Sequence, residues 1–138
     1  MNVKSSIAVS FLFFASIGAS AAGLVNEKAP DISLPDLSGK TVRLADFKGK
    51  VVFVDFWSTY CASCKYELPE INKLVEKKKG SVVALVISID KKRSHVDDYL
   101  SRLPKFSEHF HVLLDTEPKV MPAYNGLMPS SFIIDKDG

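Results

Sequence analysis

Cysteine is scarce in this sequence, because only Cys61 and Cys64 among its 138 residues carry a thiol. A zinc site needs four ligands, and the three histidines lack the spacing of a zinc-binding pair: they are His95, His109 and His111. A single disulfide over so short a loop would constrain the unfolded chain very little, which disfavours a purely structural bridge. The Cys-x-x-Cys spacing instead favours redox chemistry.

A charge excess of either sign is missing as well. The 18 lysines and arginines nearly balance the 16 acidic residues, which leaves a net charge of +2. Neither nucleic acid nor an anionic membrane surface is therefore expected as a partner. A long apolar run is also missing near the N-terminus, where the apolar stretch over residues 7–17 is too short for a confident membrane span.

The first residues have the pattern of a secretory signal. Lys4 supplies a positive charge, residues 7–17 form an apolar core, and residues 19–21 offer small side chains for cleavage. We expect a signal peptide over residues 1–21 and one small domain over residues 22–138, with an uncleaved anchor as the alternative. A protein that is exported to an oxidising compartment and has no set of structural disulfides is expected to use its two cysteines for chemistry.

One stretch, residues 53–69, organises the rest of the chain. An apolar run ends in a short polar turn, then Cys61 and Cys64 follow, and helix-forming residues come directly after. If Cys61 begins that helix, the free N–H groups of the first turn and the helix dipole favour its thiolate. The thiolate is the nucleophile of cysteine chemistry, so Cys61 is the predicted reactive sulfur. Cys64 lies one helical turn later, so the two sulfurs are predicted to form a dithiol/disulfide pair.

The remaining pattern predicts alternating strands and helices, which is an α/β fold. Turn residues at 36–40 separate two short alternating segments and predict a β-hairpin over residues 32–44. Pro69 falls inside the first long helix and should kink it, and Gly80 should close it. The predicted strands are 51–56, 81–89, 111–114 and a last one within 128–135, and the predicted helices are 62–79, 94–103 and 117–124.

These motifs resemble a known family. The thioredoxin active-site pattern matches at residues 55–57, 61–65 and Pro69. Glu67 and the upstream residues 29–31 and 39–40 resemble a narrower branch, the TlpA/ResA-type thiol–disulfide oxidoreductases of the bacterial cell envelope. The resemblance runs from about Ala29 to the last residue.

The resemblance implies a thioredoxin-like fold with the N-terminal β-hairpin and an inserted αβ unit over residues 94–114. Members of the branch continue past the position of Gly138 with an edge strand and a final helix. We therefore expect this chain to be truncated at its C-terminus and to lack that strand and helix.

The resemblance also adds residues to the predicted site. It implies a cis peptide bond before Pro129 facing the cysteines, where the residues alone would favour an ordinary trans turn proline. The backbone of Met128 should then pair with an extended substrate. Trp57 and Tyr60 complete the predicted substrate-contacting set, with Trp57 shielding the disulfide and Tyr60 placed to meet a partner.

Two carboxylates are candidates for the proton transfers. Asp55 lies in an otherwise apolar strand, where burial should raise its pKa and make it a proton relay for Cys64. Glu67 lies one helical turn beyond Cys64 and could exchange protons with it or raise a cysteine pKa. The TlpA/ResA branch usually has a different residue at Asp55, so we predict Glu67 as the stronger determinant and Asp55 as the secondary one.

The predicted function is reduction of protein disulfides in the periplasm through the Cys61–Cys64 dithiol, without a cofactor or metal. The resemblance implies a membrane electron donor that restores the dithiol, and substrates that include the cysteines of apocytochrome c during cytochrome c maturation. A peroxiredoxin-like peroxidase is one alternative, although its single peroxidatic cysteine would not be followed by a second one two residues later. A copper-binding or holding module without turnover is another.

Overall fold

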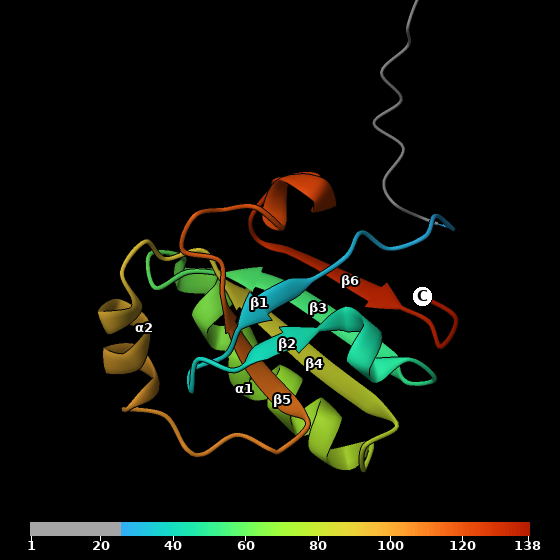
Figure 1. Cartoon of the computed structure of the whole chain (residues 1–138). Coiled ribbons are helices and arrows are strands. Elements are labelled where there is room, and N and C mark those ends of the chain that lie inside the picture. Colours follow the sequence, from blue (N-terminus) through green and yellow to red (C-terminus); the bar gives the residue numbers. More distant parts are fainter. Residues whose placement is uncertain (1–25) are drawn as a thin grey trace, which may run out of the picture.

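The computed structural model describes residues 26–138, so the predicted signal peptide over residues 1–21 lies outside the described part. Strands and helices alternate as the sequence pattern predicts (Figure 1). In chain order the elements are β1 (Ser33–Pro35), β2 (Thr41–Arg43), the 3₁₀ helix η1 (Leu44–Phe47), β3 (Val51–Trp57), α1 (Ala62–Lys77), β4 (Val82–Ser88), α2 (Arg93–Leu100), β5 (Phe110–Leu114), the 3₁₀ helix η2 (Met121–Tyr124) and β6 (Ser130–Ile134).

Four strands form the main sheet, in the order β5-β4-β3-β6. The central strands β3 and β4 are runs of apolar, mostly β-branched residues, which is the composition of parallel strands buried on both faces. They pair in parallel, β5 continues the parallel set, and β6 runs antiparallel to β3. Within residues 26–138 nothing pairs with the outer side of β6, so that strand forms an edge of the sheet.

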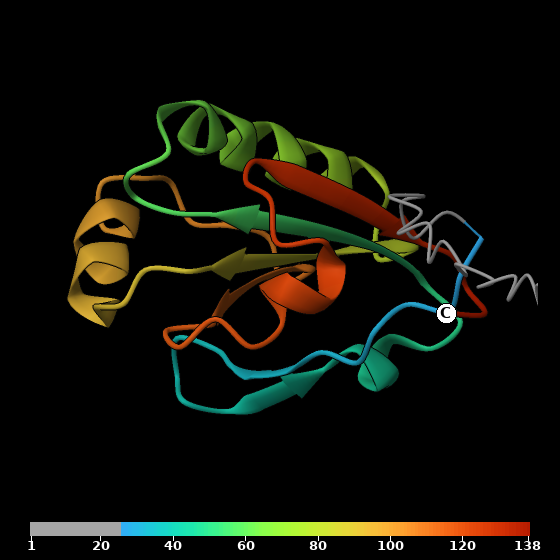
Figure 2. The same cartoon turned by 90° about the horizontal axis from the view of Figure 1, so that it is seen from above.

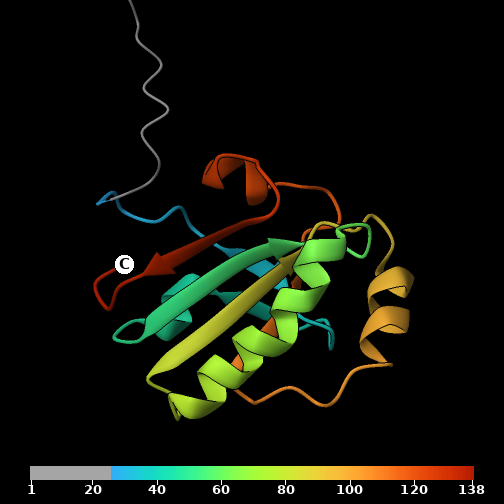
Figure 3. The same cartoon turned by 180° about the vertical axis from the view of Figure 1, so that it is seen from behind.

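The sheet lies between two covering layers, which Figure 2 shows from above. On one face, seen in Figure 3, lies α1, which buries a stripe of residues at helical spacing: Cys64, Leu68, Ile71 and Val75. On the other face lie the β1–β2 hairpin and the two 3₁₀ helices (Figure 2). The antiparallel hairpin confirms the one predicted from residues 32–44.

The helix α1 begins directly after Cys61 and contains Pro69, as predicted. It ends at Lys77, two residues before the predicted end. Gly80 follows with a backbone φ of +82°, a left-handed conformation that glycine adopts without steric cost and that lets the chain turn into β4. None of the helices in residues 26–138 is both long and apolar enough to cross a membrane.

The prediction of a helix over residues 117–124 is wrong for residues 117–120. Only Met121–Tyr124 is helical, and it is a 3₁₀ helix. The buried carboxylate of Asp115 accepts hydrogen bonds from the backbone N–H groups of Lys119, Val120 and Met121. The chain therefore turns around this side chain instead of forming its own helical hydrogen bonds. The predicted 94–103 helix is also shorter, since α2 covers Arg93–Leu100.

Candidate redox site

The two cysteines lie at the start of α1 and form a disulfide, with an S–S distance of 2.03 Å. Cys61 is the N-cap residue of the helix, and its Sγ accepts a hydrogen bond from the backbone N–H of Cys64 at 3.3 Å. Cys61 is partly exposed, whereas Cys64 is fully buried. An incoming thiol or disulfide can therefore reach Cys61 but not Cys64. The free N–H groups of the first turn favour a thiolate at Cys61 after reduction.

Asp55 lies beneath this helix. Alternate residues of a strand face opposite sides of the sheet, so Asp55 shares its side with Phe53 and Trp57, which pack in the core cluster beside Cys64 under α1. The carboxyl group is fully buried. Its Oδ1 accepts a hydrogen bond from the hydroxyl of Ser131 at 2.7 Å, while Oδ2 has no hydrogen-bond partner among the described residues.

The surroundings of Asp55 raise its pKa from 3.8 to about 6. Burial is the largest cause, because it disfavours the charged form, and the negative charge of Glu67 acts in the same direction. The hydrogen bond from Ser131 opposes both by favouring the carboxylate. A carboxyl group with such a pKa is half ionised near pH 6 and can both take up and release a proton near neutral pH.

Glu67 is half-buried on α1, one turn beyond Cys64. Its negative charge, on the helix, contributes to the raised pKa of Asp55 on the strand. The structure thus brings together both acidic residues that the sequence predicted near the cysteines. Which of them controls the cysteines more strongly stays a prediction, although Asp55 is the more deeply buried of the two.

The two aromatic residues predicted to contact a substrate have different environments. Tyr60 is 73% exposed and precedes Cys61 directly. Its hydroxyl lies 2.8 Å from Nδ1 of His95 in α2. Trp57, in contrast, is fully buried and packs against Tyr99 of α2, with 5.7 Å between ring centroids. The prediction that Trp57 contacts a substrate is corrected here, because its side chain packs the core under the active-site helix and does not reach the surface.

The Met128–Pro129 peptide bond is cis. Met128 and Cys61 both pack, partly buried, against the core cluster that contains Cys64. The pairing between β3 and β6 ends at Ser130, so the backbone of Met128 takes no part in the sheet ladder. Substrate binding by Met128 and Pro129 stays a prediction that this placement supports.

Sequence reasoning missed a buried carboxylate that holds the loop before Cys61. Asp90, which follows β4, is 1% exposed and accepts hydrogen bonds from both the backbone N–H and the hydroxyl of Thr59, at 2.9 and 2.5 Å. A third comes from the hydroxyl of Ser88 at 2.8 Å. The sequence pattern that could have predicted this contact is the pair Ser88 and Asp90 at the end of the apolar run of β4. Polar side chains at the carboxyl ends of parallel strands lie at the same edge of the sheet and can contact one another there.

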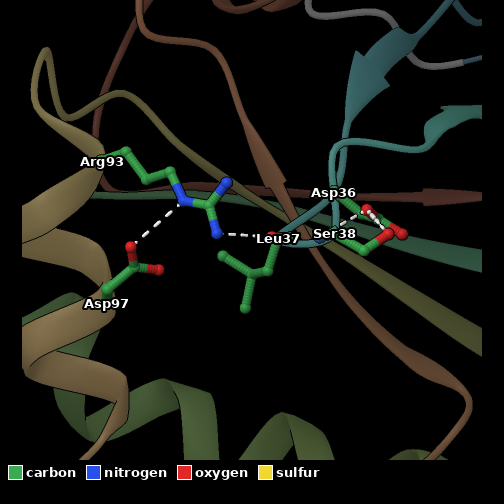
Figure 4. Close-up of polar contacts among 5 residues, drawn as sticks. All are labelled: Asp36, Leu37, Ser38, Arg93 and Asp97. Carbon is green, nitrogen blue, oxygen red and sulfur yellow. Dashed lines mark hydrogen bonds and ion pairs between the residues drawn. The ribbon is translucent and has the colours of Figure 1, made fainter.

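The helix α2 contacts both the loop before Cys61 and the β1–β2 hairpin. Figure 4 shows the Arg93 guanidinium between the Asp97 carboxylate, at 3.1 Å, and the Leu37 carbonyl in the turn of the β1–β2 hairpin, at 2.5 Å. That turn is closed by Asp36, whose Oδ1 accepts hydrogen bonds from the backbone N–H and the hydroxyl of Ser38 (Figure 4). These bonds and the nearby Lys40 lower the pKa of Asp36. The helix thus joins the hairpin to the active-site end of the sheet.

Comparison with known proteins identifies the fold family. The model of the AhpC/TSA family matches residues 25–138. The chain belongs to the AhpC/TSA family. Within this family it is 38% identical over 117 residues to the thiol-disulfide oxidoreductase ResA of Geobacillus kaustophilus, covering 83% of this chain and 65% of that protein. ResA of Bacillus subtilis is 33% identical over 112 residues, covering 80% of this chain and 61% of that protein.

Solved structures of the same kind confirm the thioredoxin-like α/β fold. A putative thiol:disulfide interchange protein DsbE from Chlorobium tepidum superposes with a TM-score of 0.73 at 33% identity, over 80% of this chain and 77% of that one. A putative thioredoxin from Neisseria meningitidis superposes with a TM-score of 0.65 at 34% identity, over 79% of this chain and 73% of that one. The chain spans 65% of the length of the ResA proteins of Geobacillus kaustophilus and Geobacillus thermodenitrificans.

In this AhpC/TSA family member, the residues of the candidate site come from separate parts of the chain. Cys64 and Glu67 lie in α1, with Cys61 as its N-cap, and Asp55 lies in β3. Tyr60 lies in the loop between β3 and α1, and the cis-proline segment directly precedes β6. No group of three or more His, Cys, Asp or Glu side chains that could hold a metal ion occurs within residues 26–138.

Proposed function

We propose that this chain catalyses thiol–disulfide exchange and works as a reductant of protein disulfides. The observation that carries the proposal is the disulfide across the first turn of α1, with the accessible sulfur of Cys61 at the N-cap and the sulfur of Cys64 buried. This asymmetry gives each cysteine one role. Cys61 exchanges with the substrate, and Cys64 exchanges only with Cys61.

In the reduced protein, the Cys61 thiolate attacks one sulfur of a substrate disulfide. A mixed disulfide forms, and the other substrate sulfur leaves as a thiolate and takes up a proton. The Cys64 thiol loses its proton and its thiolate attacks Sγ of Cys61, which closes the Cys61–Cys64 bridge and releases the second substrate thiolate. Two electrons pass from the dithiol to the substrate disulfide, and the chain ends in the disulfide form described here.

Asp55 is the proposed acceptor for the proton of Cys64. Both groups lie in the buried layer between β3 and α1, and the pKa of about 6 lets Asp55 take a proton near neutral pH and release it afterwards. Glu67 contributes by raising the pKa of Asp55 through its negative charge. Removing Asp55 should slow the closing step more than the first attack.

The proposed substrate is a protein disulfide in an extended segment. The free backbone of Met128 beside cis-Pro129 can pair with such a segment as an added strand, and the exposed ring of Tyr60 can contact its side chains. The names of the relatives, thiol-disulfide oxidoreductase ResA and thiol:disulfide interchange protein DsbE, support this substrate class. Apocytochrome c cysteines during cytochrome c maturation are the particular substrate proposed.

The proposed location is the periplasm, supported by the signal pattern of residues 1–21. A soluble dithiol in an oxidising compartment is used up after one turnover, so a membrane electron donor is proposed to restore it. Nothing in the balanced composition favours a nucleic acid as partner.

The test is a turnover assay with the reduced chain and a disulfide-bonded model protein such as insulin. The expected result is one substrate disulfide reduced per chain without added thiol, and repeated turnover when dithiothreitol regenerates the dithiol. Cys61→Ser should abolish both, and Tyr66→Ala, at a position of α1 that is 81% exposed, serves as the matched surface control. Rapid consumption of hydrogen peroxide with no reduction of insulin would contradict the proposal and favour a peroxidase.

A further inference from the structure

The hydroxyl of Ser131 is the only hydrogen-bond donor that the buried Asp55 carboxyl has among the described side chains. Asp55 and Ser131 are directly opposite each other in the antiparallel pairing of β3 with β6, so their side chains leave the same face of the sheet. The hydroxyl of Ser131 lies 2.7 Å from Oδ1, and Oδ2 has no hydrogen-bond partner within residues 26–138.

We propose that Ser131 is a positioning residue, which anchors Oδ1 of Asp55 so that Oδ2 stays free as the proton acceptor for Cys64. This inference rests on the proposed thiol–disulfide exchange and adds a residue to it. A carboxylate without this anchor could turn about its χ2 bond and would present no fixed oxygen to the thiol. The anchor comes from the sheet, so the geometry of the acceptor is set by the pairing register of two strands.

The same hydrogen bond affects how readily Asp55 ionises. Burial and the charge of Glu67, from α1, both favour the protonated form, and the Ser131 hydroxyl favours the carboxylate. The other titratable group that α1 places in this layer is Cys64, and β4 places the apolar Val86 opposite Asp55. Among residues 26–138, the Ser131 hydroxyl is thus the group that favours the ionised form of this carboxyl in its apolar surroundings.

Ser131 also connects two parts of the site. It lies two residues after cis-Pro129, at the start of the same strand whose preceding segment is proposed to bind the substrate. A shift of this segment on substrate binding would move the anchor of Asp55 with it. Ser131 itself is exposed on the edge strand, so a substitution there removes the hydroxyl without opening a cavity in the core.

The experiment compares Ser131→Val with Ser131→Thr, because valine and threonine have the same shape and only threonine keeps the hydroxyl. Infrared difference spectra of the reduced full chain follow the Asp55 carboxyl band across pH, and the band is assigned by its loss in Asp55→Asn. Ser131→Val should raise the pKa of Asp55 by about one unit, the effect of losing a hydrogen bond to a charged group. Ser131→Thr should titrate like the unaltered chain.

The kinetic readout is the rate at which Cys64 closes the disulfide from a preformed mixed disulfide at Cys61. Its pH profile should move to higher pH by the same unit in Ser131→Val, so that closure slows about tenfold below the midpoint. Because the unanchored carboxylate presents no fixed oxygen, the rate should also be lower than in Ser131→Thr well above the midpoint. Ser130→Ala is the matched control, since its hydroxyl donates to the Leu127 carbonyl and not to Asp55. It should leave the Asp55 titration unchanged.

Identical titrations in Ser131→Val and Ser131→Thr would overturn the anchoring role. A shifted Asp55 titration with an unchanged closure profile would overturn the positioning role. It would mean that the Ser131 hydrogen bond affects the ionisation of Asp55 but not the closing step. Neither result depends on whether the chain reduces a protein disulfide, so failure of this inference is distinguishable from failure of the proposed function. The latter would appear as absent insulin reduction by the unaltered chain, with the Asp55 titration still measurable.

Discussion

At the scale of single residues, Asp55 shows a conflict between stability and chemistry. This carboxyl group is fully buried, and one of its oxygens has no hydrogen-bond partner in the described part of the chain, so its ionisation destabilises the fold. Its environment offers one hydroxyl as compensation and adds the like charge of Glu67. A residue placed so unfavourably for stability is a candidate for a chemical role.

The first prediction concerns the stability of Asp55→Asn. The pKa of Asp55 in the folded chain, about 6, lies above its ordinary value of 3.8, so the folded chain loses stability as the pH rises from about 4 to about 6. The neutral asparagine avoids this loss. Asp55→Asn should therefore raise the free energy of unfolding at pH 7 by up to about 3 kcal/mol, the equivalent of the pKa difference. The gain should disappear below pH 4.

Urea denaturation of both proteins at pH 4 and pH 7 measures this gain. Asp90→Asn is the matched control, because Asp90 is equally buried but accepts three hydrogen bonds from Thr59 and Ser88. It should lower the free energy of unfolding by about 1–3 kcal/mol. A loss of stability at pH 7 in Asp55→Asn would contradict the assigned pKa.

The second prediction concerns Glu67→Gln. Removing the negative charge removes one of the causes that raise the pKa of Asp55, so this pKa should fall. The pH profile of disulfide closure should move to lower pH, opposite to the shift expected for Ser131→Val. The thiolate absorbance of the reduced Glu67→Gln and Asp55→Asn variants is followed across pH. It tests whether either carboxylate shifts the titration of Cys61 or Cys64. If neither substitution moves the titration of either cysteine, neither carboxylate has a role in the chemistry.

At the scale of elements, the loop between β3 and α1 is held from the end of β4. The Asp90 carboxylate binds both the backbone and the side chain of Thr59, two residues before Cys61. The hydroxyl of Tyr60 lies within hydrogen-bond distance of His95 in α2. The position of Cys61 as N-cap of α1 is thus supported by contacts with two neighbouring elements.

The third prediction follows for Thr59. Thr59→Val keeps the shape of the side chain but removes one donor from a buried carboxylate, so the free energy of unfolding should fall by about 1–3 kcal/mol. Alkylation of Cys61 in the reduced chain should slow, since the loop that presents its sulfur is less well fixed. Thr59→Ser keeps the hydroxyl and is the matched control. Equal stability and equal alkylation rates in the two variants would argue against this support.

Several elements follow from local pattern. The apolar β-branched runs predicted β3 and β4. The helical spacing of four apolar residues predicted the apolar side of α1, and all of them except the exposed Leu74 are buried: Leu68, Ile71, Leu74 and Val75. The order of cysteines after a strand and before a helix predicted the disulfide at the helix start. These features depend on residues close together in the chain, which periodicity and spacing describe well.

The missed features depend on contacts between distant residues. The Ser131 hydroxyl and the Asp55 carboxyl are 76 residues apart in the chain, and Thr59 and Asp90 are 31 apart. Spacing alone did not pair these polar side chains, because the pairing depends on strand register and sheet order. The turn around Asp115 was missed for a related reason, since the carboxylate replaces hydrogen bonds that a helix would have made.

At the scale of the whole molecule, the three layers place the chemistry at one end. The disulfide follows β3 and the Asp90 carboxylate follows β4, both at the carboxyl ends of parallel strands, and α2 lies at the same end (Figure 2). In open sheets with parallel strands, sites commonly form at this edge. The other covering layer, with the hairpin, is joined to α2 through Arg93.

The fourth prediction concerns the direction of electron flow. If the chain is a reductant, the equilibrium potential of its Cys61/Cys64 pair should be well below about −120 mV, the potential of the strongly oxidising disulfide donor DsbA. Equilibration with glutathione or dithiothreitol redox buffers, followed by alkylation and mass spectrometry, measures it. A value near −120 mV would mean that the chain donates disulfides instead.

The central claim, that Cys61 attacks and Cys64 resolves, is tested most directly by trapping. Reduced Cys64→Ser and Cys61→Ser chains are mixed with a disulfide-bonded protein, and covalent adducts are weighed by mass spectrometry. The exposed sulfur of Cys61 and the buried one of Cys64 predict a stable mixed disulfide with Cys64→Ser and none with Cys61→Ser. Equal trapping by both variants, or trapping by Cys61→Ser alone, would contradict the account.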